Sequence, residues 1–394
     1  MRETAIKTAG GGVNVPHRKN TKNLSCVRIP VPETVVIPMQ QSIGAPCVPL
    51  VKVGDRVLVG QKIGDSDKFV SAPIHASVSG TVKAITDIRL ANGSLSTAVT
   101  IASDGLMEVS EEVKPPKVEN LADLLKAVRE SGIVGLGGAG FPTYGKLSDK
   151  ADTIILNCAE CEPLLKLHRQ LLKAHVREVL KAFALIAETV GAKEAIIGIK
   201  EEYESTIEAL EEYIGEYPMM RIHKLPGAYP MGDEVVLIYE ATGRVVRPGG
   251  LPIECGVAVF NVETVHNVYR AVWENKPVTE KYVTVVGEVE QPITVRVPIG
   301  TRIRDVVAMA GKITTQKPVY LLGGPMMGSF GSDYQPVTKT TNAIIVLPED
   351  HTLVYRKTNR FSTAVARAAS SCCRPTWCRS CRRGKYLPYS YQGR

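Results

Sequence analysis

The segment from residue 121 to residue 273 constrains the fold most, because short apolar runs alternate there with longer stretches of helical periodicity. The pattern predicts strands at 153–157, 195–199 and 220–225, and helices at 121–131, 164–190, 203–213, 233–239 and 262–273. Strands that alternate with helices pair in parallel through right-handed crossovers. We therefore predict a Rossmann-like α/β domain over residues 118–275 of a multidomain α/β protein.

β structure is predicted on both sides of this domain. Residues 27–105 contain short alternating runs, and the phrases at 51–57 and 71–82 resemble the lipoyl and biotinyl barrel-sandwich fold. Carrier domains of that fold bear a cofactor on a lysine at a hairpin tip. The turn at 73–77 has no lysine, so we interpret the domain as a scaffold. After residue 280, a hairpin (282–289 and 293–297), a helix (303–310) and a strand (319–323) predict a small β-grasp module over 280–350.

The remaining segments are predicted to be irregular. Residues 1–26 form a polar, glycine-rich arm, residues 106–120 contain a linker, and residues 351–394 form a basic tail with four cysteines. The tail carries six basic residues from Cys372 onward and no acid, and these six account for most of the net charge of +8. The rest of the chain is thus near neutral, and we predict no nucleic-acid partner.

Cellular location is inferred from features that the sequence lacks. No apolar run approaches the roughly 20 residues that span a bilayer, and the first residues lack the apolar core of a secretory signal. Nine cysteines in a long chain without such a signal favour a reducing compartment. We expect a cytoplasmic protein that contacts a membrane only through partners.

Glycines are concentrated at 135–142, where the chain reads GLGGAGFP. Such a loop lets the backbone approach a ligand closely and aim its amide groups at a phosphate. Three polar clusters follow predicted strands or begin predicted helices: NCAECEP (157–163), AYPMGDE (228–234) and FNVET (260–264). Open α/β sheets bind ligands at the carboxyl ends of their strands, so these clusters predict a binding site there.

In this order the four motifs resemble the FMN- and NADH-binding flavoprotein subunit of respiratory complex I, and they resemble the RnfC family more closely still. The segments QSIGAPCVPLVKVGD (41–55), SAPIHASVSGTV (71–82) and GGPMMG (323–328) are similar to RnfC segments outside the flavin domain. The likeness extends over roughly residues 8–371. It implies a flavoprotein subunit that passes electrons between NADH and ferredoxin, with FMN and NAD(H) as cofactors, membrane Rnf subunits and a ferredoxin-domain partner, and a location on the inner face of the cell membrane.

The resemblance also implies roles for individual residues. The loop beneath the FMN phosphate and ribityl chain would be formed by Gly135, Gly137, Gly138, Ala139 and Gly140. An aromatic near the nicotinamide or adenine, a basic residue near the flavin and an acid facing the nicotinamide would be Phe141, Lys146 and Glu162, respectively. Further contacts to flavin, NADH ribose or FMN phosphate would come from Asn157, Glu160, Gly232, Asp233, Glu234, Asn261 and Thr264. Leu136 and Ala159 depart from complex I, which has arginine and aspartate there.

The tail departs further from the RnfC pattern. RnfC-like proteins carry two C-x2-C-x2-C-x3-C-P motifs that bind iron–sulfur clusters, whereas this chain has Cys372, Cys373, Cys378 and Cys381 in the spacing C-C-x4-C-x2-C. These four thiols are the candidate ligands of a [4Fe-4S] cluster or of zinc. The spacing also suggests a reading frame altered or truncated within the first motif. The Cys158–Cys161 pair has no second pair at metal-site spacing, and we interpret it as structural.

Three functions remain open from the sequence. The first is NADH:acceptor oxidoreduction in an Rnf-type complex. The second is a related activity, either a cobalamin reductase of the PduS kind or the electron donor of a D-proline reductase, whose motifs the segment 232–244 also resembles. The third is a non-catalytic protein whose β-grasp module binds a ligand or partner. Bound flavin would distinguish the first two from the third.

Overall fold

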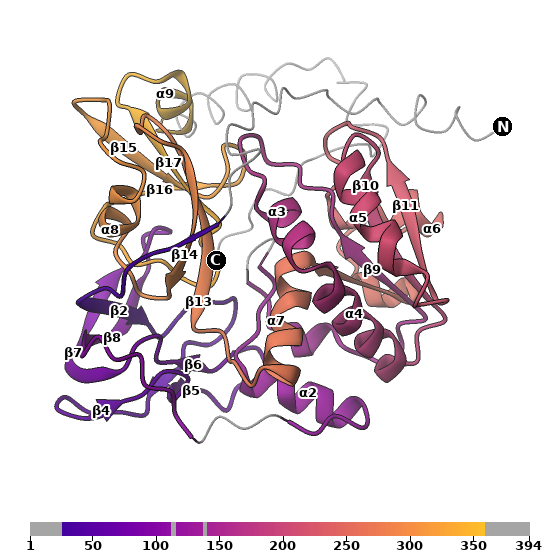
Figure 1. The fold of residues 1–394 in the computed structure, drawn as a ribbon, viewed down its shortest axis with the longest axis horizontal. Helices are drawn as coiled ribbons and strands as arrows, with labels where there is room; N and C mark the ends of the chain where they lie inside the picture. Colours follow the sequence, from indigo (N-terminus) through magenta and orange to yellow (C-terminus); the bar gives the residue numbers. More distant parts are fainter. Residues whose placement is uncertain (1–25, 112–115, 137–139, 359–394) are drawn as a thin grey trace, which may run out of the picture. The chain divides into compact units, whose positions relative to one another are not determined.

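Four parallel strands form the sheet at the centre of the chain, as the alternation predicted (Figure 1). The computed structural model describes residues 26–111, 116–136 and 140–358. The strand order is β11-β10-β9-β12, which is the order expected when the chain starts in the middle of a Rossmann-like sheet. The strands are β9 (Thr153–Asn157), β10 (Glu194–Lys200), β11 (Met220–Leu225) and β12 (Val257–Asn261).

Helices connect and cover these strands (Figure 1). They are α2 (Leu121–Glu130), α3 (Leu167–Ala174), α4 (Val176–Val190), α5 (Glu204–Ile214), α6 (Glu234–Thr242) and α7 (Val262–Trp273). The single helix predicted at 164–190 is wrong. Leu164 has a positive φ of 69°, and His175, at φ −136° and ψ 37°, separates α3 from α4. Apolar periodicity continues across this break, so the sequence pattern does not reveal it.

Alternating side chains of β9 divide between two hydrophobic cores. Ile154 and Leu156 belong to a core that includes residues of α4 and α7, and these two helices pack side by side (Figure 1). Ile155 belongs to a second core, together with Leu237 and Ile238 of α6. Side chains of a strand point alternately to its two faces, so helices cover both faces of the sheet. The carboxyl ends of the strands are then the edge where a ligand can approach.

Two small antiparallel sheets precede the α/β region. One has the order β2-β8-β7-β4 and the other β3-β5-β6. Their strands are β2 (Thr34–Pro38), β3 (Val48–Pro49), β4 (Arg56–Val57), β5 (Lys62–Asp65), β6 (Ile74–His75), β7 (Gly80–Arg89) and β8 (Leu95–Ser103). His75 and Ser77, in the turn where a carrier domain would present its lysine, are buried. A buried turn cannot swing, which agrees with the scaffold interpretation.

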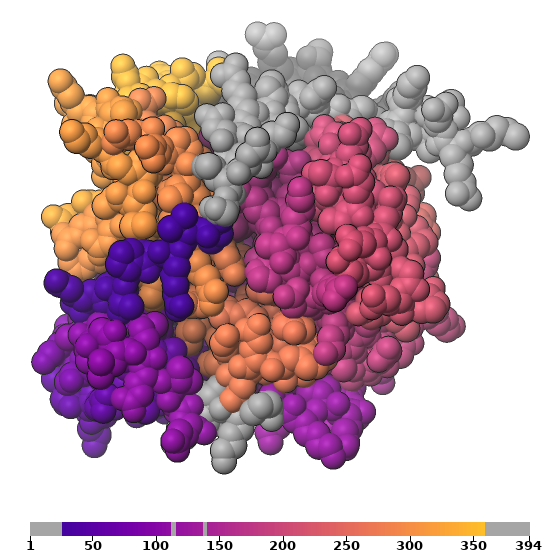
Figure 2. All heavy atoms as spheres, viewed as in Figure 1, coloured from indigo at the N-terminus to yellow at the C-terminus, as the bar shows by residue number. Residues whose placement is uncertain are grey.

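A six-stranded mixed sheet forms the C-terminal module. Its order is β1-β14-β13-β17-β15-β16. The elements are β1 (Val27–Arg28), β13 (Glu280–Gly287), β14 (Ile293–Pro298), α8 (Ile303–Ala308), β15 (Pro318–Leu322), β16 (Ser329–Gly331) and β17 (Ala343–Pro348). The hairpin, helix and strand predicted here are confirmed. The central strand β17, parallel to β13, was not predicted. Strand β1 pairs with β14, and Figure 2 shows its indigo atoms against the orange atoms of the sheet.

Residues 348–394 form a second unit, of which the structure describes the helix α9 (Thr352–Thr358). No helix in the described ranges has both the length and the hydropathy that a bilayer crossing requires.

Lys339 is a buried cation between three parts of the first unit. Its side chain is 1% exposed, and its Nζ donates hydrogen bonds of 2.7 Å to the carbonyl oxygens of Pro73 and Gly132. Burial lowers the pKa of Lys339 to about 7, opposed by the nearby Cys47. Removing a charged amine from water favours its neutral form, and a neutral amine still has two hydrogens for the two carbonyl oxygens.

We expect Lys339 to make the folded protein more stable as the pH rises above 7. Between about pH 7 and its ordinary pKa of 10.5, Lys339 binds a proton in the unfolded chain and not in the folded one, so the free energy of unfolding increases with pH. Relative to Lys339→Met, the wild type should gain about 2–3 kcal/mol between pH 7 and pH 9.5. Chemical denaturation of both proteins at the two pH values measures this gain. A difference that does not change with pH would contradict it.

Candidate flavin and nicotinamide site

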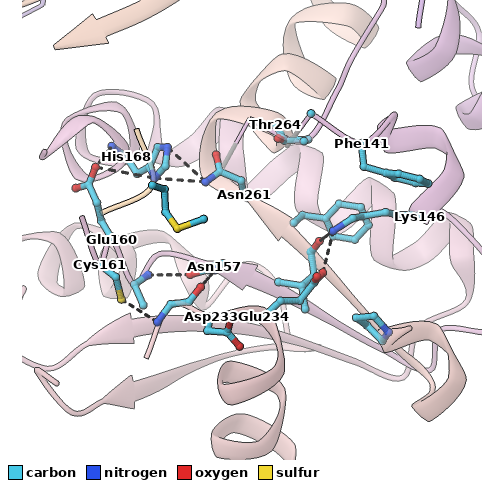
Figure 3. Close-up of a pocket in the computed structure, with 18 of the residues that line it drawn as sticks. Phe141, Lys146, Asn157, Glu160, Cys161, His168, Asp233, Glu234, Asn261 and Thr264 are labelled. Carbon is cyan, nitrogen blue, oxygen red and sulfur yellow. Dashed lines mark hydrogen bonds and ion pairs between the residues drawn. The ribbon is translucent and has the colours of Figure 1, made fainter. Parts of the chain in front are cut away.

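A cavity of about 660 Å³ lies at the carboxyl edge of the central sheet. This volume is within the usual range for small-molecule sites. The glycine loop, the ends of β9 and β12 and the start of α6 contribute to its wall, and the C-terminal module adds Met326, Met327 and Asn342. Figure 3 shows ten of the lining side chains. The predicted site residues within the described ranges, Gly135, Gly140, Phe141, Lys146, Asn157, Glu160, Glu162, Gly232, Asp233, Glu234, Asn261 and Thr264, all line this one cavity.

Hydrogen bonds at both ends and from two other elements hold the glycine loop. The amide of Gly135 donates to the carbonyl of Phe141 at 2.8 Å and closes the loop. The amide of Leu136 donates to Thr264 Oγ1 at 3.1 Å, and Asn342 Nδ2 donates to the carbonyl of Leu136 at 2.9 Å. Gly140 has a φ of 77°, which favours glycine. The predicted residues Gly137, Gly138 and Ala139 lie outside the described ranges.

The loop after β9 is joined to the turn before α6. Asn157 Nδ2 donates to the carbonyl of Gly232 at 2.9 Å, and the amide of Gly232 donates to Cys161 Sγ at 2.9 Å. A Cβ atom on Gly232 would lie 2.1 Å from the carbonyl oxygen of Ala159. Only glycine therefore allows these two segments to approach so closely.

A charged pair lies in the same cavity. Lys146, at the end of a short 3-10 helix (Thr143–Lys146), places its Nζ 2.8 Å from Glu234 Oε1 (Figure 3). Glu234 is the first residue of α6, and Asp233 is its N-cap, accepting hydrogen bonds from the amides of Val235 and Val236. The capping interpretation of Asp233 is thus correct, and its carboxylate also borders the cavity.

His168 contacts two predicted site residues but was not itself predicted. Its amide donates to Glu160 Oε1 at 3.3 Å, and its ring Nδ1 lies 3.3 Å from Asn261 Nδ2 (Figure 3). Asn261 ends β12 and caps α7 through its Oδ1, which accepts from the amide of Glu263. His168 comes five residues after the NCAECEP motif. No spacing rule marks it, because it reaches the cavity through the helix break that the sequence did not reveal.

Glu162 is bound by the C-terminal module, about 160 residues further along the chain. Its Oε2 accepts a hydrogen bond from the amide of Met326 at 3.0 Å, and its Oε1 accepts one from the amide of Met327 at 2.8 Å. The sequence marked the segment 323–328 as a family feature but did not place it in the site.

The two cysteines after β9 differ in their surroundings. Cys158 is fully buried, and burial raises the pKa of its thiol, which fits a structural role. Cys161 lines the cavity. In the part of the chain that the structure describes, no group of three or more His, Cys, Asp or Glu side chains is arranged to hold a metal ion. The tail residues Cys372, Cys373, Cys378 and Cys381 lie outside that part.

Comparison with protein families assigns each of the three regions. The RnfC barrel sandwich hybrid domain matches residues 7–106, the Nuo51 FMN-binding domain matches residues 128–270, and the SLBB domain matches residues 282–330. The predicted fold class, a barrel-sandwich domain, a Rossmann-like flavin domain and an SLBB-like β-grasp module, is thereby confirmed.

Individual relatives agree with these families. The chain is 37% identical over 367 residues to the C-type subunit of the Na⁺-translocating ferredoxin:NAD⁺ oxidoreductase complex of Acetobacterium woodii, covering 89% of this chain and 82% of that protein. It is 43% identical over 255 residues to the cobalamin reductase PduS of Citrobacter freundii, covering 64% of this chain and 55% of PduS.

A solved structure shares the fold. The crystal structure of an NAD⁺-reducing [NiFe]-hydrogenase in the H₂-reduced state matches with a TM-score of 0.51 and 26% identity, covering 62% of this chain and 50% of that chain. The same order of motifs, the same three domain families and an A. woodii relative matched over most of its length lead to one conclusion. The chain belongs to the RnfC family of ion-translocating oxidoreductase subunits.

Proposed function

We propose that this chain binds FMN and NAD(H) in the cavity at the carboxyl edge of the central sheet and exchanges electrons between NADH and ferredoxin within an Rnf-type complex. The observation that carries the proposal is the convergence of the predicted site residues on this cavity, within the segment that matches an FMN-binding domain. The residues fit such a ligand. The buried Asn342 Oδ1 has no hydrogen-bond partner among the described residues, and it can accept from a ligand hydroxyl or N–H group.

We assign the residues three kinds of role. Backbone contact with the FMN phosphate and ribityl chain falls to Gly135, Gly137, Gly138, Ala139 and Gly140, with Asn261 and Thr264 on the phosphate side. Flavin contacts fall to Lys146, Asn157 and Glu160. Nicotinamide, adenine or ribose contacts fall to Phe141, Glu162, Gly232, Asp233 and Glu234.

When bound, FMN supplies the hydride and single-electron chemistry. The chain's own task is to orient both ligands and to exclude water. Lys146 and Glu234 form an ion pair at the cavity wall, so their charges are fixed in position before a ligand binds. Burial raises the pKa of the Tyr229 phenol, with contributions from Cys161, Glu162 and Asp233. Tyr229 therefore lines the cavity as a neutral hydrogen-bonding group.

The proposal extends to partners and location. The A. woodii relative is named as part of a complex, and we assign this chain to a membrane-associated complex of that kind. Its partners would be membrane Rnf subunits and a ferredoxin-domain protein, on the cytoplasmic face. Onward transfer of single electrons requires an iron–sulfur centre, for which the tail cysteines Cys372, Cys373, Cys378 and Cys381 are this chain's candidates.

A second candidate function is cobalamin reduction. The match to PduS, at 43% identity over 255 residues, supports it. Both candidates use the same flavin site and differ in the electron acceptor. Anaerobic assays of the NADH-reduced protein with ferredoxin and with a cobalamin, compared at equal concentration, distinguish them by which acceptor is reduced faster.

An anaerobic absorption spectrum tests the proposed function. The purified chain is loaded with FMN, freed of excess ligand, and measured before and after addition of NADH. We expect a flavin band near roughly 450 nm that bleaches with NADH, because aligned nicotinamide and flavin exchange a hydride. Added broad absorbance near 400 nm would indicate a cluster in the tail. A chain that takes up no FMN would refute the proposal and favour the non-catalytic binding function.

A further inference from the structure

The turn between β15 and β16 is built to receive a carboxylate. This turn, residues 323–328, presents the consecutive amides of Met326 and Met327 to the two oxygens of Glu162. Consecutive backbone amides that point to one side form a concave site for an anion. Each carboxylate oxygen has one donor, so the carboxylate plane is fixed as well as its position.

The turn itself is held in place by the sheet. The amide of Gly323 donates to the carbonyl of Ala343 on β17 at 2.8 Å, and the amide of Gly328 donates to the carbonyl of Gly324 at 2.8 Å. Gly323 has a φ of 99°, which favours glycine. The amides that contact Glu162 thus belong to a closed turn anchored on the central strand of the module.

Gly324 lies directly against the acid. A Cβ atom at this position would be 2.2 Å from Glu162 Cδ and 2.2 Å from its Oε2. Any side chain at 324 would therefore displace the carboxylate, and the absence of one is what lets the turn close over Glu162. The Met327 side chain contributes little to this contact, since the residue is 83% exposed.

We propose that the turn 323–328 of the SLBB module is a positioning element for Glu162, which it aims at the nicotinamide. The inference rests on the proposed function and deepens it: an element outside the FMN-binding domain sets the affinity for the dinucleotide. FMN binding is set by the glycine loop and the ends of β9 and β12, so the turn acts on NAD(H) far more than on FMN.

The test is a double-mutant cycle on the FMN-loaded full chain. Dissociation constants for NAD⁺ are measured by calorimetry for the wild type, Gly324→Ala, Glu162→Ala and the double variant, with the FMN dissociation constant and thermal stability of each measured alongside. We expect Gly324→Ala to weaken NAD⁺ binding about tenfold, equivalent to about 1.4 kcal/mol, with FMN affinity changed less than threefold. In the Glu162→Ala background, Gly324→Ala should change NAD⁺ binding less than twofold, because the group it displaces is gone.

Two further comparisons make the result independent of folding defects. Gly215→Ala adds a Cβ that meets nothing within 4 Å, so it should leave NAD⁺ binding unchanged. Met327→Pro removes the amide hydrogen that Glu162 Oε1 accepts, whereas Met327→Ala keeps it. Only the proline variant should weaken NAD⁺ binding, and this pair decides the matter if Gly324→Ala does not fold.

The outcomes separate the two proposals. If the wild type binds FMN and NAD⁺ but Gly324→Ala and Met327→Pro bind NAD⁺ equally well, the positioning role is wrong and the proposed function stands. An effect of Gly324→Ala that is undiminished without Glu162 also overturns the positioning role. A wild type that binds neither ligand overturns both.

Discussion

Replacing Gly232 by alanine should weaken FMN binding by more than about 100-fold, equivalent to at least about 2.7 kcal/mol. The added Cβ would lie 2.1 Å from the carbonyl oxygen of Ala159 and 2.9 Å from Cys161 Sγ. Backbone atoms must shift to relieve such a contact, so the loop after β9 and the turn before α6 move apart. The hydrogen bonds that Gly232 forms with Asn157 and Cys161 lengthen, and the predicted flavin and nicotinamide contacts on both segments lose their register.

Fluorescence quenching during titration of the apoprotein with FMN measures this effect. Thermal unfolding should also show a loss of about 1–3 kcal/mol, the usual cost of overpacking a close contact. Gly215→Ala is the matched control, because its Cβ is added in open space. FMN affinity within threefold of the wild type in Gly232→Ala would mean that this approach of the two segments does not form the flavin site.

Replacing Asn342 by aspartate should lower FMN affinity by about 10- to 100-fold. Asn342 Nδ2 is the donor that holds the carbonyl of Leu136 in the glycine loop, at 2.9 Å. Aspartate has no donor there and places a negative charge against that carbonyl oxygen. Leaving a buried carbonyl unsatisfied costs about 1–3 kcal/mol. The loop beneath the proposed phosphate position would lose its contact with the C-terminal module, and the added charge also opposes a bound phosphate.

The same FMN titration measures the effect of this substitution. Asn342→Ala, which loses the donor without adding charge, should have a smaller effect than Asn342→Asp. Asn92→Asp is the control for the charge alone, because Asn92 is exposed in the turn between β7 and β8 and uses only its Oδ1, as an acceptor from Ser94. FMN affinity that is equal in Asn342→Asp and the wild type would show that the C-terminal module does not support the glycine loop.

Most elements of this fold were predictable from local patterns. Strand β9 and helix α7 match their predicted bounds, because the apolar run at 153–157 and the helical period at 262–273 are uninterrupted. The missed elements depend on contacts that no local pattern records. Strand β17 is inserted between β13 and β15 by pairing in parallel with β13, nearly 60 residues away, and strand β1 joins the same sheet from the start of the described chain.

The candidate site divides in the same way. The sequence by itself determined the glycine loop, the polar residues at the ends of β9 and β12 and the capping acid Asp233, because parallel strands bring their carboxyl ends to one edge and each of these features is read within a few residues. Only the tertiary structure decided that Met326 and Met327 bind Glu162, that Asn342 holds Leu136 and that His168 contacts Asn261. The physical reason is that these contacts use backbone amides or single polar side chains far apart in sequence. A backbone amide is present in every residue except proline, so its part in a site depends on position alone.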